Sequence, residues 1–595
     1  MNNRRLRNRQ QSFFQKQSTI TDVEQSQPYP SSIFQRMIVW LYHLLLITTP
    51  LFFAFTTDEL FEFNKMMLTY TYVVLICTAW LTRSIFEKRL VWKHTKLDYF
   101  IAIFLLSQVL STIFSIHPYT SWYGYYSRFH GGLASLITYA LLYWAFVSNV
   151  TRRNLRSLLL STMMAGGIVG LYAIGEHFGH SFSCLMTSGY TSFGVSCWVQ
   201  DVQHRVFATF GQPNWLAAYA LMLLSVLIGT LLSHWPSQWQ RFSLYSVYVL
   251  LFLTLLYTRS RSGFLGFIAV TLVILFGVAL RWWYRRERPK MMMGLLASLT
   301  FGMILLSGTP FSPSISEQLA PKEIPSKTVE TTAAEPAVVN RLDIGGTDSG
   351  EIRKIVWQGA VAVWKRYPLL GSGVETFAYS YYRDRPVAHN LVSEWDFLYN
   401  KAHNEFLNFL ATTGIVGLIS YLALLGGYLV ISLIGFIKLT RENKDDHANV
   451  VLSMAAAVIG LSVSNFFGFS TVVVTVLQYL AFAVTLLLIT NPSQQPKQKN
   501  KTSIQQQALF LLVVVAALFV LSSISNLYRA DQAYTSAKAL LGKGELQASG
   551  TEIATALKLN PDEALFWDEL AQLYAQAAVS YTQTKTPGVD VTAIT

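Results

Sequence analysis

The chain has 595 residues, of which 52% are hydrophobic and only 13% are charged, and its formal net charge is +13. A soluble protein would carry about twice that charged fraction, and apolar runs of about 17 to 25 residues, long enough to cross a bilayer, recur along the chain. These properties exclude an ordinary soluble globular protein. Unbroken apolar runs such as LLVVVAALFVL also exclude the alternating strands of a membrane β-barrel.

The first 35 residues are polar and basic, and no apolar segment with a cleavage site precedes the first long apolar run, so we expect no removable signal peptide. Each long apolar run that follows predicts one membrane-spanning helix. The runs lie near residues 36–56, 67–86, 99–115, 132–150, 157–175, 214–233, 243–258, 262–280, 291–308, 405–437, 448–467, 471–490 and 506–526. The predicted fold class is therefore all-α, a polytopic transmembrane bundle of about 12–13 spans, and we expect a break in the longest run near Gly426 and Gly427.

The basic residues predict the orientation of this bundle. With the N-terminus in the cytoplasm and alternating loops, the inner segments hold 26 Lys and Arg, whereas the short outer loops hold five. The basic excess is thus a topology signal and indicates no nucleic-acid partner. We expect a multi-pass protein of a bacterial plasma membrane.

Composition divides the chain into five predicted parts. They are a basic cytoplasmic tail (1–35), a transmembrane block (36–308), a large outer loop (309–404), closing transmembrane helices (405–526) and an extracytoplasmic tail (527–595). The large loop begins with a Ser/Thr/Pro/Glu-rich stretch, which predicts little fixed structure, and continues with an amphipathic helix over EIRKIVWQGAVAVWKRYPLL. The tail resembles a tetratricopeptide repeat at positions such as Ala556, Pro561, Trp567 and Tyr574, although a generic helical hairpin fits as well.

Three cysteines are present. Cys77 lies inside a predicted span and is expected to be packed there. Cys184 and Cys197 share one outer loop in an oxidising compartment, so a disulfide between them and two free thiols are both open.

Polar residues gather at the outer ends of the spans. Four predicted outer segments carry them: Arg128 in SRFHGG, Arg205 ahead of GQPN, Arg259 and Arg261 in TRSRSG, and His403, Asn404 and Glu405 at the start of a long apolar helix. Each has a structural explanation: an arginine can reach phospholipid headgroups, and Asn404 and Glu405 suit a first helical turn, as Asn214 suits a helix cap. Their convergence on one face indicates instead a cationic site for a phosphate or diphosphate at the membrane surface.

Several motifs resemble the O-antigen ligase superfamily. These are Arg205 ahead of GQPN, SRSG at 260–263, WKRYPLLGSGVETF at 364–377 and AHNEFLNFLATTGIVGL at 402–418. That superfamily includes O-antigen ligases, O-antigen polymerases and bacterial protein O-oligosaccharyltransferases. The resemblance spans roughly residues 36–490.

The resemblance implies a membrane glycosyltransferase. It would move a glycan from an undecaprenyl-diphosphate carrier to a lipid, glycan or protein acceptor, with no metal, nucleotide or other cofactor. By motif, His403 corresponds to the family's essential histidine, and Arg205 and Arg261 to its diphosphate-binding arginines. Direct attack of the acceptor hydroxyl would invert the anomeric centre. Arg128, Arg259, Asn404 and Glu405 are possible supporting residues, and Arg353, Tyr379, Arg383 and Arg385 are candidates to hold the acceptor or the glycan.

A non-enzymatic reading remains open, namely a flippase for lipid-linked glycans or a membrane scaffold. A flippase would need charges along an internal passage, and the cores of the predicted spans are nearly free of ionisable groups, with His43 the main exception.

Overall fold

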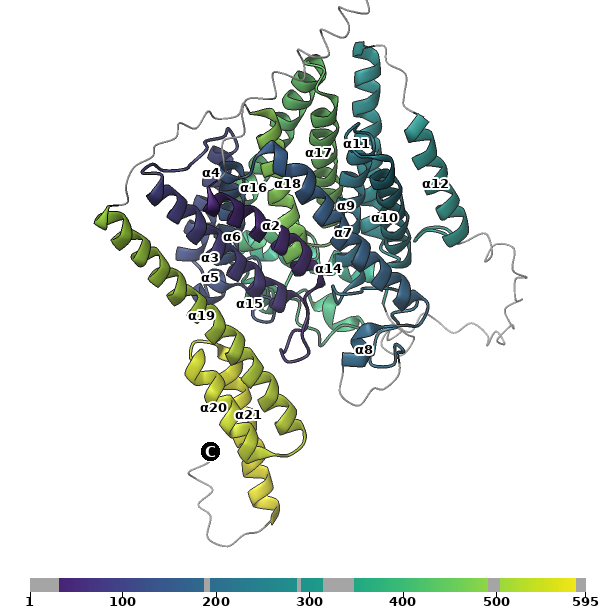
Figure 1. Ribbon diagram of the computed structural model, residues 1–595. Helices are drawn as coiled ribbons and strands as arrows, with labels where there is room; N and C mark the ends of the chain where they lie inside the picture. The colour runs from purple at the N-terminus through teal and green to yellow at the C-terminus, as the bar shows by residue number, and fades with distance from the viewer. Residues whose placement is uncertain (1–31, 187–192, 286–290, 314–346, 491–502, 585–595) are drawn as a thin grey trace, which may run out of the picture.

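A computed structural model describes residues 32–186, 193–285, 291–313, 347–490 and 503–584 (Figure 1). These residues form helices and loops, with no named β-strand among them. The basic N-terminal tail, apart from its last residues, and most of the Ser/Thr/Pro/Glu-rich stretch lie outside the described ranges.

Each of the thirteen predicted runs coincides with one helix. The helices are α2 (Ile33–Leu51), α3 (Glu62–Phe86), α4 (Asp98–Ile113), α6 (Leu133–Asn149), α7 (Arg152–His177), α9 (Pro213–Leu231), α10 (Gln238–Tyr257), α11 (Arg261–Arg285), α12 (Met291–Ser307), α16 (Glu405–Arg441), α17 (Asp445–Asn465), α18 (Val472–Ile489) and α19 (Ile504–Gly542). Within the described ranges, nine of these helices are long and apolar enough to cross a membrane, α4, α6 and α12 are shorter apolar helices, and α2 falls in neither group. The predicted class, an all-α polytopic membrane bundle, is confirmed.

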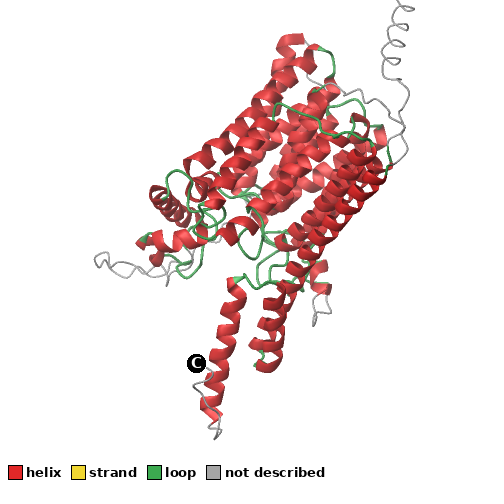
Figure 2. Cartoon of the chain, turned by 90° about the vertical axis from the view of Figure 1, so that its left-hand side faces the viewer, coloured by secondary structure: helices red, strands yellow, loops and turns green. Residues whose placement is uncertain are grey.

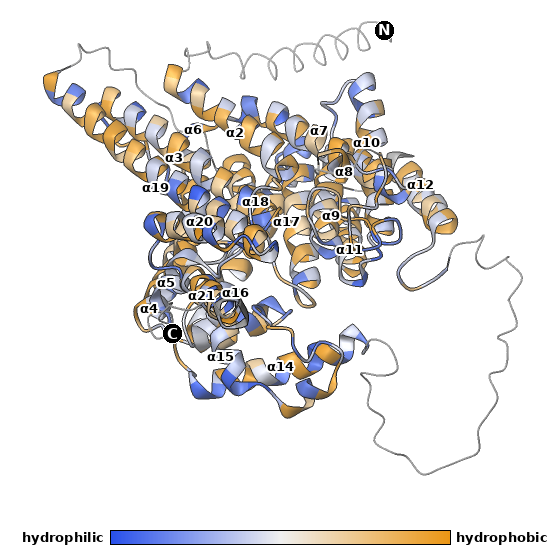
Figure 3. Cartoon of the chain, turned by 90° about the horizontal axis from the view of Figure 1, so that it is seen from below, coloured by the Kyte–Doolittle hydropathy of each residue, from blue (hydrophilic) through white to orange (hydrophobic). Residues whose placement is uncertain are grey.

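The core of the bundle lies around α9 and α18. Both helices are apolar on every side, and about nine-tenths of their most apolar stretch is buried inside the protein. The apolar stretch of α19, by contrast, has no buried residue and forms an outer face of the molecule, as the view from below indicates (Figure 3). An apolar helix can be stable with such exposure where the surrounding solvent is lipid.

Shorter helices cover the lower end of the bundle in Figure 1. They are α5 (Pro118–Tyr123), α8 (Phe182–Met186), α14 (Ser349–Arg366), α15 (Phe377–Asp384) and the 3-10 helix η1 (Val387–Leu391). Helix α14 is the predicted amphipathic helix: it buries Ile352, Val356 and Val363 in a cluster shared with α15 and the start of α16.

The tail consists of three packed helices. The lower part of α19 packs with α20 (Leu546–Leu559), and α21 (Ala564–Thr584) follows, so that the group projects from the lower end of the bundle (Figure 2). Helix α19 runs without interruption through the predicted boundary at residue 527. Pro561 lies in the turn between α20 and α21, and the assignment to a tetratricopeptide repeat stays a prediction.

The break in α16 lies at Gly414, so the expectation of a break near Gly426 and Gly427 is wrong. Gly414 has φ 65° and ψ −169°, a conformation that essentially only glycine adopts. A Cβ atom there would lie 2.2 Å from the carbonyl oxygen of Leu369. The cause of the break is therefore a close approach by the segment 368–373, whereas Gly427 packs against the ring of Phe100 inside a regular helix.

The segment 368–373 also supplies partners for the backbone around this break. The amides of Ile415 and Val416 donate to the carbonyls of Pro368 (2.9 Å) and Leu369 (3.2 Å), and the amide of Gly373 donates to the carbonyl of Thr412 (2.9 Å). Interrupted helices are tolerated in lipid only when other protein groups satisfy the freed backbone groups. The PLLGSG and TTGIVGL motifs thus form one joint, which fixes the position of the first half of α16.

Candidate active site

The loop that carries Arg205 lies against the turn between α10 and α11. Arg205 Nε donates to the carbonyl of Thr258 (3.3 Å), and the amide of Val206 donates to the carbonyl of Tyr257 (3.3 Å). Arg261 is the first residue of α11 and, like Arg205, is exposed. Two arginines from separate hairpins therefore reach the same end of the bundle.

A side-chain hydrogen bond joins the same two turns. Ser260 Oγ donates to Asn214 Oδ1 at 2.8 Å. The prediction that Asn214 caps α9 is wrong, because the helix begins one residue earlier at Pro213 and Gln212 occupies the cap position. The GQPN and SRSG motifs are thus two sides of one contact.

Arg353 on α14 lies near both of these arginines. Although part of the surface of Arg205 is exposed, partial loss of solvent around its guanidinium, followed by the positive charge of Arg353, lowers its pKa. Dehydration also lowers the pKa of Arg353 itself, and the charge of Arg261 adds to that effect. Three guanidinium groups from three different elements are therefore electrostatic neighbours, an arrangement suited to a multivalent anion.

His403 lies beside this cationic group, immediately before α16. Its ring meets those of Tyr399 and Phe469 edge to face, with centroids 5.1 and 5.4 Å away. Burial, followed by the positive charges of Arg353 and Arg128, lowers the pKa of His403 to about 3. The imidazole is therefore neutral at pH 7.

The tautomer of His403 follows from its backbone contact. Nδ1 lies 3.3 Å from the carbonyl oxygen of Lys401, which can only accept, so Nδ1 carries the proton. Nε2 then keeps its lone pair and can accept a proton.

Asn404 and Glu405 have structural partners. Asn404 caps α16, because its side chain accepts from the amide of Leu407 at 3.0 Å. The Glu405 carboxylate accepts from the hydroxyl of Tyr421 (2.7 Å) and from the amide of Ser470 (2.6 Å). Glu405 therefore holds the loop between α17 and α18 against the start of α16.

That loop carries Phe469, whose ring connects several groups of the site. Besides His403, the ring lies 5.2 Å from the guanidinium carbon of Arg128 and 5.7 Å from Nζ of Lys401. Arg128 also lies 4.9 Å from the ring of Trp215, so its guanidinium is held between two aromatic rings. Its Nη1 is buried and has no hydrogen-bond partner among the described residues.

Lys401 forms a buried ion pair with Glu375, with Nζ and Oε1 2.5 Å apart. The pair lines a cavity of about 60 Å³ that reaches down between α4, α16 and α18, where Gln108, Asn408 and Gln478 also line it. The second carboxylate oxygen of Glu375 has no partner among the described residues. The wall of this cavity is thus partly polar, although the cavity lies inside the bundle.

Residues with strained backbone conformations are concentrated in the segments of the candidate site. Eight non-glycine residues have positive φ in the described ranges, and six of them lie on the segments of the site. They are Ser127, Phe129, Ala208, Arg259, Glu375 and His403. Such conformations persist where the surrounding structure holds them, and they concentrate at functional sites.

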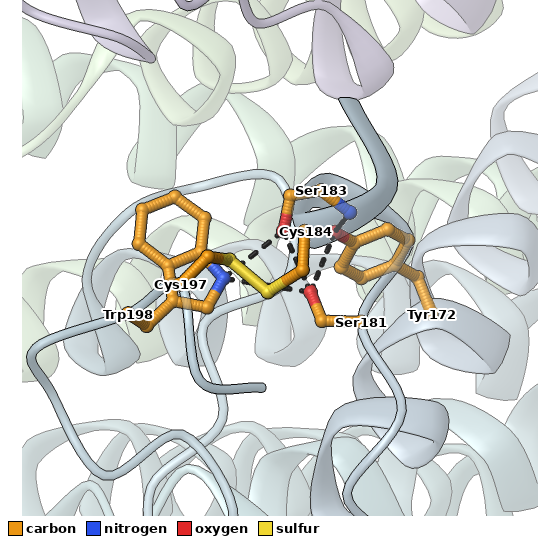
Figure 4. Close-up of a disulfide and its surroundings, with 6 residues drawn as sticks. All are labelled: Tyr172, Ser181, Ser183, Cys184, Cys197 and Trp198. Atoms are coloured by element: carbon orange, nitrogen blue, oxygen red, sulfur yellow. Dashed lines mark hydrogen bonds between the residues drawn. A yellow bond between two sulfur atoms is a disulfide. The ribbon is translucent and has the colours of Figure 1, made fainter. Parts of the chain in front are cut away.

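A disulfide joins Cys184 and Cys197 at the edge of this end of the bundle (Figure 4). Trp198 Nε1 donates to Ser183 Oγ (3.0 Å), and the amide of Ser183 donates to the hydroxyl of Tyr172 on α7 (2.9 Å). These contacts tie the loop that precedes Arg205 to α7. Cys77 is free.

A family model described as O-antigen ligase matches residues 246–422. This segment of the chain is similar to O-antigen ligases. The matched segment runs from α10 into α16 and includes Arg261, Arg353 and His403, while Arg128 and Arg205 precede it. The resemblance read from the motifs is therefore confirmed at the level of the superfamily. No curated protein sequence matches the chain.

The structure adds two aromatic side chains to the site that the sequence did not single out. The roles of Phe469 and Trp215 follow from contacts between distant segments, for which no local pattern exists. The aromatic run FFGF between two spans was the available signal. Among the described residues, no group of three or more His, Cys, Asp or Glu side chains could hold a metal ion.

Proposed function

We propose that the chain transfers a glycan from an undecaprenyl-diphosphate carrier to a hydroxyl group of an acceptor. The reaction would take place at the outer leaflet of a bacterial plasma membrane, with the N-terminus in the cytoplasm. The observation that carries the proposal is the convergence of Arg205, Arg261 and Arg353 beside a neutral His403. The family match supports the coarser statement, a membrane enzyme of the O-antigen ligase type.

The chemistry follows from the charges. The acceptor oxygen attacks the anomeric carbon, and the bond from that carbon to the diphosphate oxygen breaks. Negative charge grows on the departing diphosphate, where Arg205, Arg261 and Arg353 would stabilise it in a partly dehydrated site. The leaving group is already activated, so no nucleotide is required, and a direct attack inverts the anomeric centre.

His403 would take the proton of the attacking hydroxyl. Its Nε2 has a free lone pair, and the Nδ1 contact to the carbonyl of Lys401 orients the ring. Arg128 contacts the same Phe469 ring as His403 and would add positive potential near the reacting oxygen atoms. Arg259 shares the turn of Arg261, and we assign it no direct contact with the substrate.

The proposal has three versions, which differ in the acceptor. They are an O-antigen ligase, an O-antigen polymerase and a protein O-oligosaccharyltransferase. Helices α19 to α21 pack beside the site segments, and the hydroxyl of Tyr126 donates to Asp531 Oδ1 at 2.6 Å. A rigid helical unit next to the site favours a large acceptor, a glycan or a protein.

The decisive experiment replaces His403 by alanine in the full-length protein. Transfer should fall by about 10²- to 10⁴-fold, the usual contribution of a general base, and the lipid-linked donor should accumulate in cells. His234→Ala is the matched control, because His234 pairs with Asp446 at the opposite end of the bundle. Unchanged transfer by a normally inserted His403→Ala protein would refute the proposal.

A flippase for lipid-linked glycans is the non-enzymatic alternative. Purified protein in liposomes would then move a labelled lipid-linked glycan between the leaflets without an acceptor. Such movement, together with no transfer to any acceptor, would favour the flippase.

A further inference from the structure

Aromatic side chains form a group between the candidate active site and the tail helices. The group comprises His117, Tyr119, Tyr123 and Tyr125 in and around α5, and Tyr379 on α15; we refer to it as the aromatic platform. In the view from below, α5 and α15 lie close to α21 (Figure 3). The platform contains none of the three arginines and does not contain His403.

Tyr379 has the geometry of a stacking surface. The imidazole of His117 stacks on it, with centroids 4.8 Å apart and an interplanar angle of 12°. Thr120 Oγ1 donates to the Tyr379 hydroxyl at 3.3 Å, which fixes the ring from its other end. The side chain is nevertheless 40% exposed, so a large part of a fixed ring is open to a ligand.

The platform continues into the active site. Tyr125 lies 6.2 Å from Tyr379 between ring centroids. The positive charge of Arg128, three residues further along the same loop, is among the charges that act on the Tyr125 hydroxyl. A chain molecule that begins at the arginines could therefore extend past Arg128 onto these rings.

The tail supplies polar groups to the same place. The Tyr119 hydroxyl donates to Asn560 Oδ1 at 3.0 Å. Burial raises the pKa of Glu563 to about 7, and the negative charge of Glu563 acts on the hydroxyls of Tyr119 and Tyr379. An amide and a carboxylic group thus border a set of aromatic rings.

We propose that the exposed rings of the aromatic platform bind sugar residues of a glycan that reaches beyond the reacting anomeric carbon. A pyranose ring presents C–H bonds on its faces and hydroxyl groups on its rim. The faces suit exposed aromatic rings, and the rim suits the phenol groups that the same rings carry. The side chain of Asn560 contacts the Tyr119 hydroxyl through both Oδ1 (3.0 Å) and Nδ2 (2.9 Å), so the tail holds one ring of the platform in place. The proposal rests on the proposed function, which brings a glycan to this end of the bundle.

The test measures sugar binding without the diphosphate. The probe is the phosphate-free oligosaccharide released by mild acid from the host's lipid-linked glycan, added to full-length protein in nanodiscs and followed by saturation-transfer NMR. Tyr379→Ala should weaken binding about three- to tenfold, the range for loss of one aromatic contact, whereas Tyr379→Phe keeps the ring and should stay within about twofold of the wild type. Equal affinity of Tyr379→Ala and wild type, or an equal loss in Tyr379→Phe, would overturn the platform.

Two further measurements distinguish a failure of the aromatic platform from a failure of the proposed function. His403→Ala should bind the probe as the wild type does; if it also transferred glycan normally, the proposed function would fail while the platform stood. In transfer assays, a raised KM of Tyr379→Ala for the lipid-linked donor assigns the platform to the donor glycan, and a raised KM for the acceptor assigns it to an acceptor glycan. An unchanged KM for both substrates would contradict the platform even if transfer itself were intact.

Discussion

Arg353 is the residue whose charge connects the parts of the site. It acts on Arg205 and on His403, and Arg261 acts on it in turn. We expect Arg353→Ala to lower glycan transfer by about 10- to 100-fold, because one charged donor to the leaving diphosphate is lost. Lys354→Ala removes the same charge from an exposed neighbouring position and should have little effect. Equal losses in the two variants would show that only the overall charge of α14 matters.

The pH dependence of transfer also depends on a single residue, His403. A proton-accepting histidine must be neutral, and His403 has a pKa of about 3, well below its ordinary value. The kcat/KM of the free enzyme should therefore show no loss due to His403 near pH 6.5. Arg353→Gln removes one of the charges that lower this pKa, so the acid limb should move to higher pH. A wild-type inflection near pH 6.5 that Arg353→Gln leaves in place would contradict this assignment.

Phe469 positions the site through its ring. It contacts His403, Arg128 and Lys401. Phe469→Leu retains most of the volume but loses the cation–π contacts, so kcat should fall by about three- to tenfold while the protein stays folded. Phe466→Leu, on an exposed side chain of the same loop, is the control. A change in kcat of the same size in the control would point to the loop as a whole.

At the scale of elements, the joint between α16 and the segment 368–373 sets where His403 lies. Gly414→Ala places a Cβ atom 2.2 Å from a backbone oxygen, in a conformation that alanine rarely adopts. We expect a loss of about 1 to 3 kcal/mol or more in stability, measured as a lower thermal midpoint in detergent. Gly426→Ala in the same helix meets nothing within 4 Å and should be neutral or stabilising. Equal midpoints for the two variants would refute the joint.

Helix positions could be predicted from the chain because membrane spans depend on local composition. Thirteen apolar runs became thirteen helices, and the amphipathic pattern of α14 matches its buried residues Ile352, Val356 and Val363. The break in α16 could not be located, because Gly414 and Gly426 look alike in sequence. Only the approach of Leu369 from a distant segment distinguishes them.

At the scale of the whole molecule, the two ends of the bundle differ. Arg205 precedes α9, and His234 follows it, so the two lie at opposite ends of one predicted span. In intact cells of a Cys77→Ser background, His204→Cys and Lys354→Cys should react with a membrane-impermeant maleimide. His234→Cys should react only after permeabilisation, because the basic inner segments predict a cytoplasmic location. Labelling of all three positions from the outside would refute the proposed topology.

Some site residues could be named from sequence motifs, whereas others were found only through their contacts. The difference lies in whether the signal is local in the sequence. His403, Arg205 and Arg261 stood out because a cation or an imidazole at the end of an apolar helix is locally unusual, and a short motif is enough to reveal it. The positions of the helices follow in the same way from hydropathy, which acts over one segment at a time, and the orientation of the bundle stays a prediction from charge. The proximity of Arg353 to His403, the contacts of Phe469 and the closeness of the tail to α15 depend on how segments far apart in the chain pack together. No window of sequence contains both partners of such a contact, so it emerged only when the helices were assembled.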